Sequence, residues 1–132
     1  MKVLVDTSVW SIAFRRGSPS HTGLVTELKS LIQARRVVMI GPIRQELLSG
    51  IREKGQFDAL KGHLNAFPDL NLIEDDYVTA AHFFNLCRVR GIQGSNTDYL
   101  ICSAAVRHNL EIFTTDKDFD LYSSCLPIKL HH

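Results

Sequence analysis

The sequence lacks the features that mark disulfide-stabilised, zinc-binding and membrane-spanning proteins. Its 132 residues contain no C-x-x-C pair, and the three cysteines, Cys87, Cys102 and Cys125, are odd in number and widely spaced. We therefore expect neither a disulfide framework nor a zinc site, but three reduced thiols that lie mostly in the core. No apolar run approaches the roughly 20 residues that span a bilayer, so we expect no membrane association.

A dominant charge is also missing. The formal net charge is +1, so a nucleic-acid partner would have to be attracted by a local group of cations rather than by a global field. Residues 1–14 hold a single Lys and an early Asp with no small-residue cleavage site after them, so we expect no signal peptide and a location in the cytoplasm. His131 and His132, a tag remnant or a natural end, are assigned no function.

What the sequence does contain is typical of one α/β domain. With 45% hydrophobic and 22% charged residues, its composition is that of an ordinary globular protein, and its length fits a single domain over residues 1–132. Short apolar segments alternate with helical patterns, which predicts a mostly parallel central sheet flanked by helices. The expected strands are 2–5, 37–40, 70–73, 111–113 and 126–130. The expected helices are 8–14, 24–34, 56–66 and 95–108, with two more around Ile43–Ile51 and Tyr77–Cys87.

Four carboxylates fall near the ends of the predicted strands. Asp6 follows the first strand directly, and Asp116 follows the strand 111–113 after two threonines. Glu46 lies one turn into the helix after the second strand, where we expect it to be half-buried, and Asp98 lies in the first turn of a later helix. Because parallel strands end on one edge of a sheet, and ligands bind outside that edge, the four acids should converge there.

Each acid also has a purely structural interpretation. Asp6 could cap the next helix, Glu46 could complement a helix dipole, Asp98 could belong to a capping box with Ser95, and Asp116 could begin an Asx-turn. Two carboxylates about 5 Å apart, however, repel by roughly 3 kcal/mol at an effective dielectric of about 20, so four on one edge call for a counter-ion. Mg²⁺ or Mn²⁺ is favoured because these cations prefer oxygen ligands and no His or Cys belongs to the four motifs. Such a site is typical of phosphoryl chemistry.

Four stretches carry a family resemblance. VDTSVW, PIRQELLSG, SNTDYLICSAA and FTTDKDFD, in this order and spacing, resemble the PIN-domain ribonucleases, and among them the VapC-type toxins of bacterial type II toxin–antitoxin pairs. The resemblance covers essentially the whole chain and implies a PIN-like parallel sheet flanked by helices. It also implies a metal-dependent endoribonuclease with Asp6, Glu46, Asp98 and Asp116 in the metal site, a homodimer, and an antitoxin protein that covers or enters the site.

Further residues near the acids follow from the same resemblance. Asp118 matches a family position of variable role and is either a fifth acid or a structural residue. Four hydroxyl residues resemble those that support the family's acids: Thr7, Ser8, Thr97 and Thr115.

The mechanism expected from these residues is hydrolysis of an RNA phosphodiester. Asp6, Asp98 and Asp116 would hold one or two Mg²⁺, while Glu46 would bind a metal or orient the attacking water. The products would carry 5′-phosphate and 3′-hydroxyl ends, as in other members of the family. The candidates for steering the RNA backbone are Arg15, Arg16, Arg44 and Lys117, each of which could equally be an ordinary solvated charge.

Three other functions compete with this interpretation. A phosphatase of the haloacid-dehalogenase type also begins with a strand that ends in Asp, but it needs a second Asp two residues later, where this chain has Ser8. A DNase would use the same acids, since they do not read the sugar. A binding module that keeps the fold without turnover is disfavoured by the complete set of acids.

The region 43–66 carries many apolar residues and could receive a helix of the antitoxin. Packing of the same residues in the core or against a second copy is an equally good explanation. The residues are Leu47, Leu48, Ile51, Phe57, Leu60 and Leu64.

Overall fold

The centre of the protein is a four-stranded parallel sheet. The computed structural model describes residues 1–15 and 22–132. The sheet has the order β2-β1-β3-β4, and its strands are β1 (Val3–Val5), β2 (Val37–Val38), β3 (Glu111–Phe113) and β4 (Lys129–Leu130). In register, Leu4 pairs with Val38 on one side and Ile112 on the other. All three residues of β1 are fully buried, as expected for a central parallel strand covered by helices.

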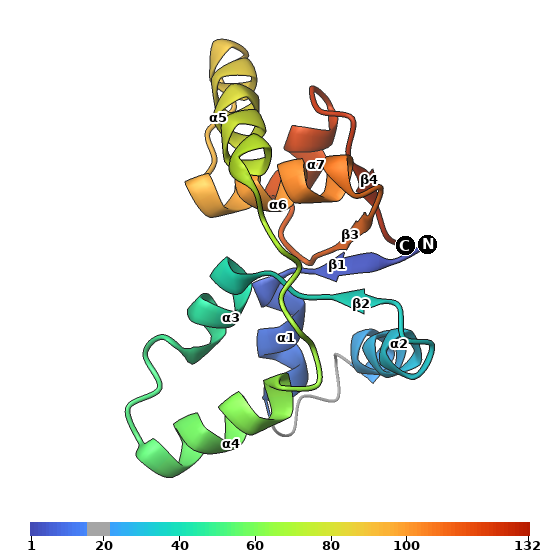
Figure 1. The fold of residues 1–132 in the computed structure, drawn as a ribbon. Coiled ribbons are helices and arrows are strands. Elements are labelled where there is room, and N and C mark those ends of the chain that lie inside the picture. Colours follow the sequence, from blue (N-terminus) through green and yellow to red (C-terminus); the bar gives the residue numbers. More distant parts are fainter. Residues whose placement is uncertain (16–21) are drawn as a thin grey trace.

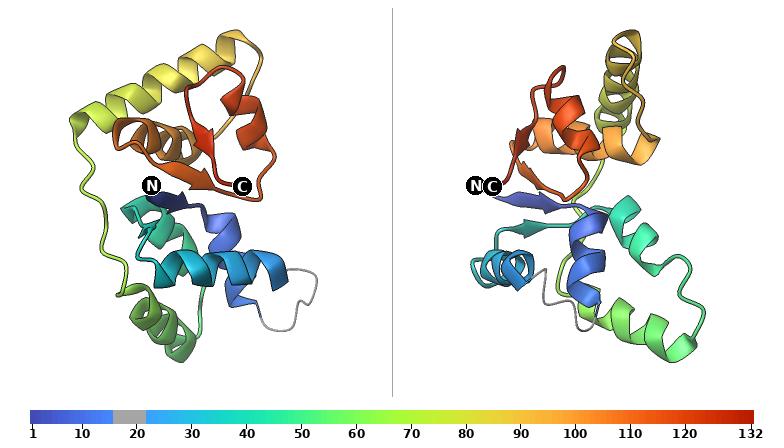
Figure 2. Two further views of the ribbon diagram at one scale, coloured as in Figure 1. Left: turned by 90° about the vertical axis from the view of Figure 1, so that its right-hand side faces the viewer. Right: turned by 180° about the vertical axis from the view of Figure 1, so that it is seen from behind.

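The helices gather around the two halves of the sheet (Figures 1 and 2). Around β1 and β2 lie α1 (Thr7–Phe14), α2 (Thr22–Gln33), α3 (Gly41–Leu48) and α4 (Lys54–Leu64). Around β3 and β4 lie α5 (Glu74–Val89), α6 (Asn96–Arg107) and α7 (Asp118–Ser123). The chain passes from the first half to the second along residues 65–73 (Figure 1). The predicted α/β class with a parallel sheet is thus confirmed.

The prediction of a strand at 70–73 is wrong. The passing segment makes one parallel bridge, between Met39 and Asp69, and one further backbone bond from Leu70 N to Met39 O at 2.8 Å. Leu70 and Leu72 still pack against the core, so their apolar character reflects burial of an extended segment rather than strand pairing. Further differences accompany this one: β2 and β4 are shorter than the predicted strands 37–40 and 126–130, and Ile51 lies beyond the end of α3.

Buried apolar side chains form one cluster that spans the sheet and includes residues from both helical groups. Cys87 and Cys102 are buried in it, and Cys125 is half-buried with its Sγ 2.7 Å from that of Cys87. Among the described residues, none of the helices has both the length and the apolar character that crossing a membrane requires.

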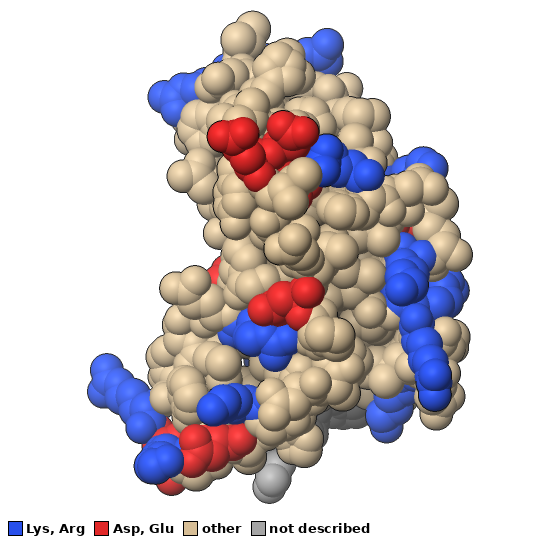
Figure 3. Space-filling model, in the orientation of Figure 1, with Lys and Arg blue, Asp and Glu red and all other residues tan. Residues whose placement is uncertain are grey.

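The site is positioned by the central pair of strands. Val5 of β1 pairs with Phe113 of β3, and the Asp6 amide then donates to the Phe113 carbonyl at 2.9 Å. The residues that follow β1 and β3 therefore lie side by side at one edge of the sheet. In the space-filling view the outline is notched on this side, between the half with α3 and the half with α6, and acidic atoms show at its edge (Figure 3).

Candidate active site

Asp6 lies at the end of β1 and is held by three donors. Its Oδ1 accepts from the Thr7 amide at 2.8 Å, which makes Asp6 the N-cap of α1, and its Oδ2 accepts from Ser8 Oγ at 3.1 Å and Thr114 Oγ1 at 2.8 Å. The side chain is buried. Burial raises the pKa of Asp6 above its usual range, the hydrogen bonds from Thr114, Thr7 and Ser8 oppose this, and the charge of Asp116 adds to it.

The hydroxyl that the sequence reasoning missed is Thr114. Besides donating to Asp6, Thr114 Oγ1 accepts from the Asp116 amide at 3.0 Å. Thr115, named in its place, contributes its backbone amide, which donates to Ser8 Oγ at 3.1 Å. The pairing of β1 with β3 could have indicated Thr114. Because Val5 pairs with Phe113, the residue after Phe113 must lie beside Asp6.

Asp98 reaches the site from the first turn of α6. Its amide donates to the N-cap residue Ser95 at 3.1 Å, and its Oδ2 accepts from the Tyr122 hydroxyl of α7 at 2.6 Å. Burial raises the pKa of Asp98, as do the negative charges of Asp6 and Asp116, while the bond from Tyr122 lowers it. Burial and the adjacent carboxylate raise the pKa of Tyr122, so its hydroxyl remains a donor.

Asp116 and Asp118 lie on the exposed side of the site. Asp116 Oδ1 accepts from the Asp118 amide at 2.9 Å, so Asp116 does form the turn that leads into α7. Among the described residues, Asp98, Asp116 and Asp118 form a group in which one carboxylate oxygen of each lies within 4.8 Å of the others. The geometry therefore brings Asp118 to the other acids.

Glu46 approaches from α3 and is exposed, not half-buried as predicted. The buried residues of α3 are Ile43 and Leu47, which leaves Glu46 at the boundary of that face. Partial desolvation raises the pKa of Glu46, and the charges of Asp6 and Asp98 raise it further. The four predicted acids are thus electrostatically linked, although Asp6 and Glu46 stand outside the group of closest oxygens.

The remaining predicted residues differ in their surroundings. The Thr7 hydroxyl is buried and has no hydrogen-bond partner among the residues that the structure describes. Thr97 lines a neighbouring cavity of about 400 Å³ with Pro42 and Leu100. Arg15 and Lys117 are exposed. Arg16 lies outside the described residues.

Arg44 forms hydrogen bonds within the fold. Its guanidinium donates to Asp69 Oδ1 at 3.0 Å, to the Leu64 carbonyl at 3.1 Å and to the Phe67 carbonyl. These bonds tie α3 to the end of α4 and to the segment that follows it, and they use three of the five N–H donors of the guanidinium. Arg44 therefore has a structural role, and its contact with RNA stays a prediction.

The chain belongs to the PIN domain family, which matches residues 3–123. Ribonuclease VapC11 of Mycobacterium tuberculosis is 34% identical over 125 residues, which cover 90% of either protein. Both findings confirm the resemblance seen in the four sequence motifs.

Solved structures share the fold. FitAcB from Neisseria gonorrhoeae has a TM-score of 0.79 at 20% identity, over 98% of this chain and 96% of that chain. VapBC2 from Rickettsia felis, bound to a DNA fragment from its promoter, has a TM-score of 0.77 at 17% identity, over 99% and 98% of the two chains. At such identities the likeness confirms the PIN-like architecture.

Proposed function

We propose that this protein is a metal-dependent endoribonuclease and the toxin of a toxin–antitoxin pair. The observation that carries the proposal is a family match over nearly the whole chain, together with acids from separate elements at one sheet edge. The ribonuclease relative, 34% identical, supports RNA as the substrate. The phosphatase alternative gains no support from Ser8, which donates to Asp6.

The acids fit a hard divalent cation, and we assign Mg²⁺ or Mn²⁺ to them. The group of three is made only of carboxylate oxygens, which these cations prefer. We propose that Asp98, Asp116 and Asp118 hold the metal directly. Asp6 and Glu46 would contact it through bound water or as additional ligands at the rim of the site. A metal bound there would lower the pKa of a water molecule and neutralise charge on the phosphate.

Other residues of the site would have separate roles in the reaction. Asp6 is fixed by Thr7, Ser8 and Thr114, so it would present its carboxylate without reorganisation. Glu46 is exposed and has a raised pKa, which suits a residue that orients the attacking water and takes up its proton. Lys117 and Arg15, with Arg16, would attract the RNA backbone.

The decisive experiment is cleavage of a labelled single-stranded RNA with and without Mg²⁺ or Mn²⁺. We expect metal-dependent cleavage to 5′-phosphate ends, and its loss in Asp116→Asn, because Asp116 is an exposed acid of the group. Asp120→Asn is the matched control, since it removes the same charge from an exposed position on α7. Parallel reactions with single-stranded DNA and a small phosphate ester test the alternatives, and cleavage of either with RNA intact would refute the proposal.

We further propose that the antitoxin binds between α3 and α4. A cavity of about 490 Å³ there is lined by Leu48, Phe57 and Pro68, with Arg44, Lys61 and Asp69 around it. Leu47 and Leu64, predicted for the same surface, are buried in the core instead. Co-expression with the adjacent small open reading frame, followed by pull-down of the wild type and of Phe57→Glu, tests this surface. Equal recovery with both would contradict it.

We propose a homodimer through α5. Ile73, Tyr77 and Val78 are large apolar residues exposed at its beginning, next to the cavity that Tyr77 and Pro42 line. A second copy would cover this surface close to the acids. We place the assembled protein in the cytoplasm, where reducing conditions keep its free thiols reduced.

A further inference from the structure

We infer that Tyr122 is a positioning residue for Asp98, and that Gly94 is a glycine because Tyr122 must pass it to reach that carboxylate. This inference rests on the proposed function, since it assigns Asp98 to the metal. It adds two residues from outside the acidic set and gives each a physical task that substitution can test.

Tyr122 is held rigidly. Its side chain is fully buried, and its ring packs against Tyr99 and Phe119 with centroid separations of 5.0 and 5.1 Å. A buried tyrosine hydroxyl needs a hydrogen-bond partner, and this one donates to Asp98 Oδ2 at 2.6 Å. The ring therefore cannot move without losing both its packing and the hydrogen bond to Asp98.

Asp98 is consequently fixed at two points. Ser95 holds its backbone amide at the start of α6, and Tyr122 holds one oxygen of its carboxylate. Fixing one oxygen sets the plane of the carboxylate and hence the direction of the other. Mutation of a residue that holds a metal ligand in this way typically lowers metal affinity or activity by about 10- to 100-fold.

The same bond sets the position of α7 relative to α6. Asp118 and Tyr122 are four residues apart on α7, so they lie on one face of that helix, one turn from each other. Tyr122 contacts Asp98, while Asp118 belongs with Asp98 to the group of acids. The hydroxyl thus controls the separation between acids of two different helices.

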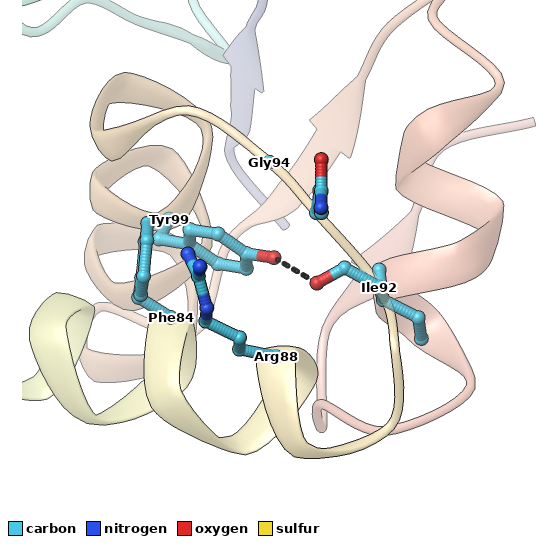
Figure 4. Close-up of a pocket in the computed structure, with 6 residues that line it drawn as sticks. Phe84, Arg88, Ile92, Gly94 and Tyr99 are labelled. Atoms are coloured by element: carbon cyan, nitrogen blue, oxygen red, sulfur yellow. Dashed lines mark hydrogen bonds between the residues drawn. The ribbon is translucent and has the colours of Figure 1, made fainter.

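The absence of a side chain at Gly94 makes room for the contact between Tyr122 and Asp98. It lies on the loop between α5 and α6, beside Tyr99 and Ile92 (Figure 4). A Cβ at Gly94 would overlap the Tyr122 hydroxyl and would lie 2.8 Å from its Cζ and 2.9 Å from its Cε1. Gly91, in the same loop, has a φ of +76°, whereas no such left-handed backbone explains Gly94. The requirement at Gly94 is therefore the close approach of Tyr122.

The test measures metal binding without RNA. Tyr122→Phe keeps the ring and removes the hydroxyl, and we expect its dissociation constant for Mn²⁺, from titration calorimetry, to rise about 10-fold. Its thermal midpoint without metal should stay near the wild-type value. Ser123→Ala, which removes an exposed hydroxyl from the same helix, is the control and should bind Mn²⁺ like the wild type. Binding by Tyr122→Phe within about twofold of the wild type would overturn the inference.

A second variant disturbs the same contact from the side of Gly94. Gly94→Ala should push the phenol aside and weaken Mn²⁺ binding although Tyr122 is retained. Combined with Tyr122→Phe, Gly94→Ala should add little to the loss of Mn²⁺ affinity, because either change removes the same hydrogen bond to Asp98. Full additivity of the two losses would overturn the inference. A wild type that binds Mn²⁺ but leaves RNA intact would refute the proposed function while these comparisons still decide the role of Tyr122. Absence of Mn²⁺ binding by the wild type would overturn the inference itself.

Discussion

Asp6 combines two tasks that substitution can separate. It caps α1, and it carries a charge into the acidic site. Asn is as good an N-cap as Asp, whereas Ala is not. Asp6→Asn should therefore keep its fold and lose RNA cleavage by about 100-fold, while Asp6→Ala should in addition lose about 1 kcal/mol of unfolding free energy. Urea unfolding and cleavage rates of both variants check this, and equal stability of the two would contradict the capping role.

The pH dependence of stability reports the burial of the acids and the repulsion among them. The pKa values of Asp6, Glu46 and Asp98 are raised in the folded protein. The folded state then binds more protons than the unfolded state, so each acid's contribution to stability is complete at low pH and is lost as the pH rises through its folded pKa. Without metal, the wild type should therefore lose more stability than Asp98→Asn as the pH rises above 3.8, the usual Asp value.

Unfolding in urea at a series of pH values from about 4 to 7 measures this difference. Addition of Mn²⁺ should reduce the loss in the wild type, since a ligand bound only by the folded state stabilises it. Parallel curves for the wild type and Asp98→Asn would show that the Asp98 carboxylate does not destabilise the metal-free fold.

At the scale of elements, Arg44 links α3 to the chain beyond α4. Its three interactions, with Asp69 and the carbonyls of Leu64 and Phe67, would be lost in Arg44→Met, which keeps an apolar stem of similar length. We expect the unfolding free energy to fall by about 1–3 kcal/mol because the acceptors lose their donor. Chemical denaturation measures the fall. Unchanged stability with weaker RNA binding would instead support the RNA contact predicted from the sequence.

The elements differed in how readily the sequence revealed them. Apolar runs such as Val3–Val5, with Asp6 at the end, predicted both the central strands and the edge where the acids lie. Thr114 and Tyr122 were missed because their partners are distant in sequence, and only the strand register and the packing of α7 against α6 bring them together. The strand predicted at 70–73 was wrong because apolar residues of this segment pack against the core without pairing with a strand.

At the scale of the whole molecule, the exposed face of α5 predicts the assembly. Tyr77→Glu places a charge in the proposed dimer surface, where burial without a partner is unfavourable. We expect the mass measured by light scattering after gel filtration to fall from that of two chains to that of one. Val89→Glu, at an exposed apolar residue at the other end of α5, is the control. A wild type that is already a monomer would refute the dimer.

The single passage along residues 65–73 has a consequence for how the chain could be divided. Along this segment the described chain leaves the half that holds Asp6 and Glu46 for the half that holds Asp98, Asp116 and Asp118 (Figure 1). A break at the exposed Asn71 would leave two fragments, each with an incomplete set of acids. Activity would then depend on fragment complementation through the β1–β3 pairing, so a nuclease too toxic to express intact could be produced as two inert pieces and reconstituted on mixing.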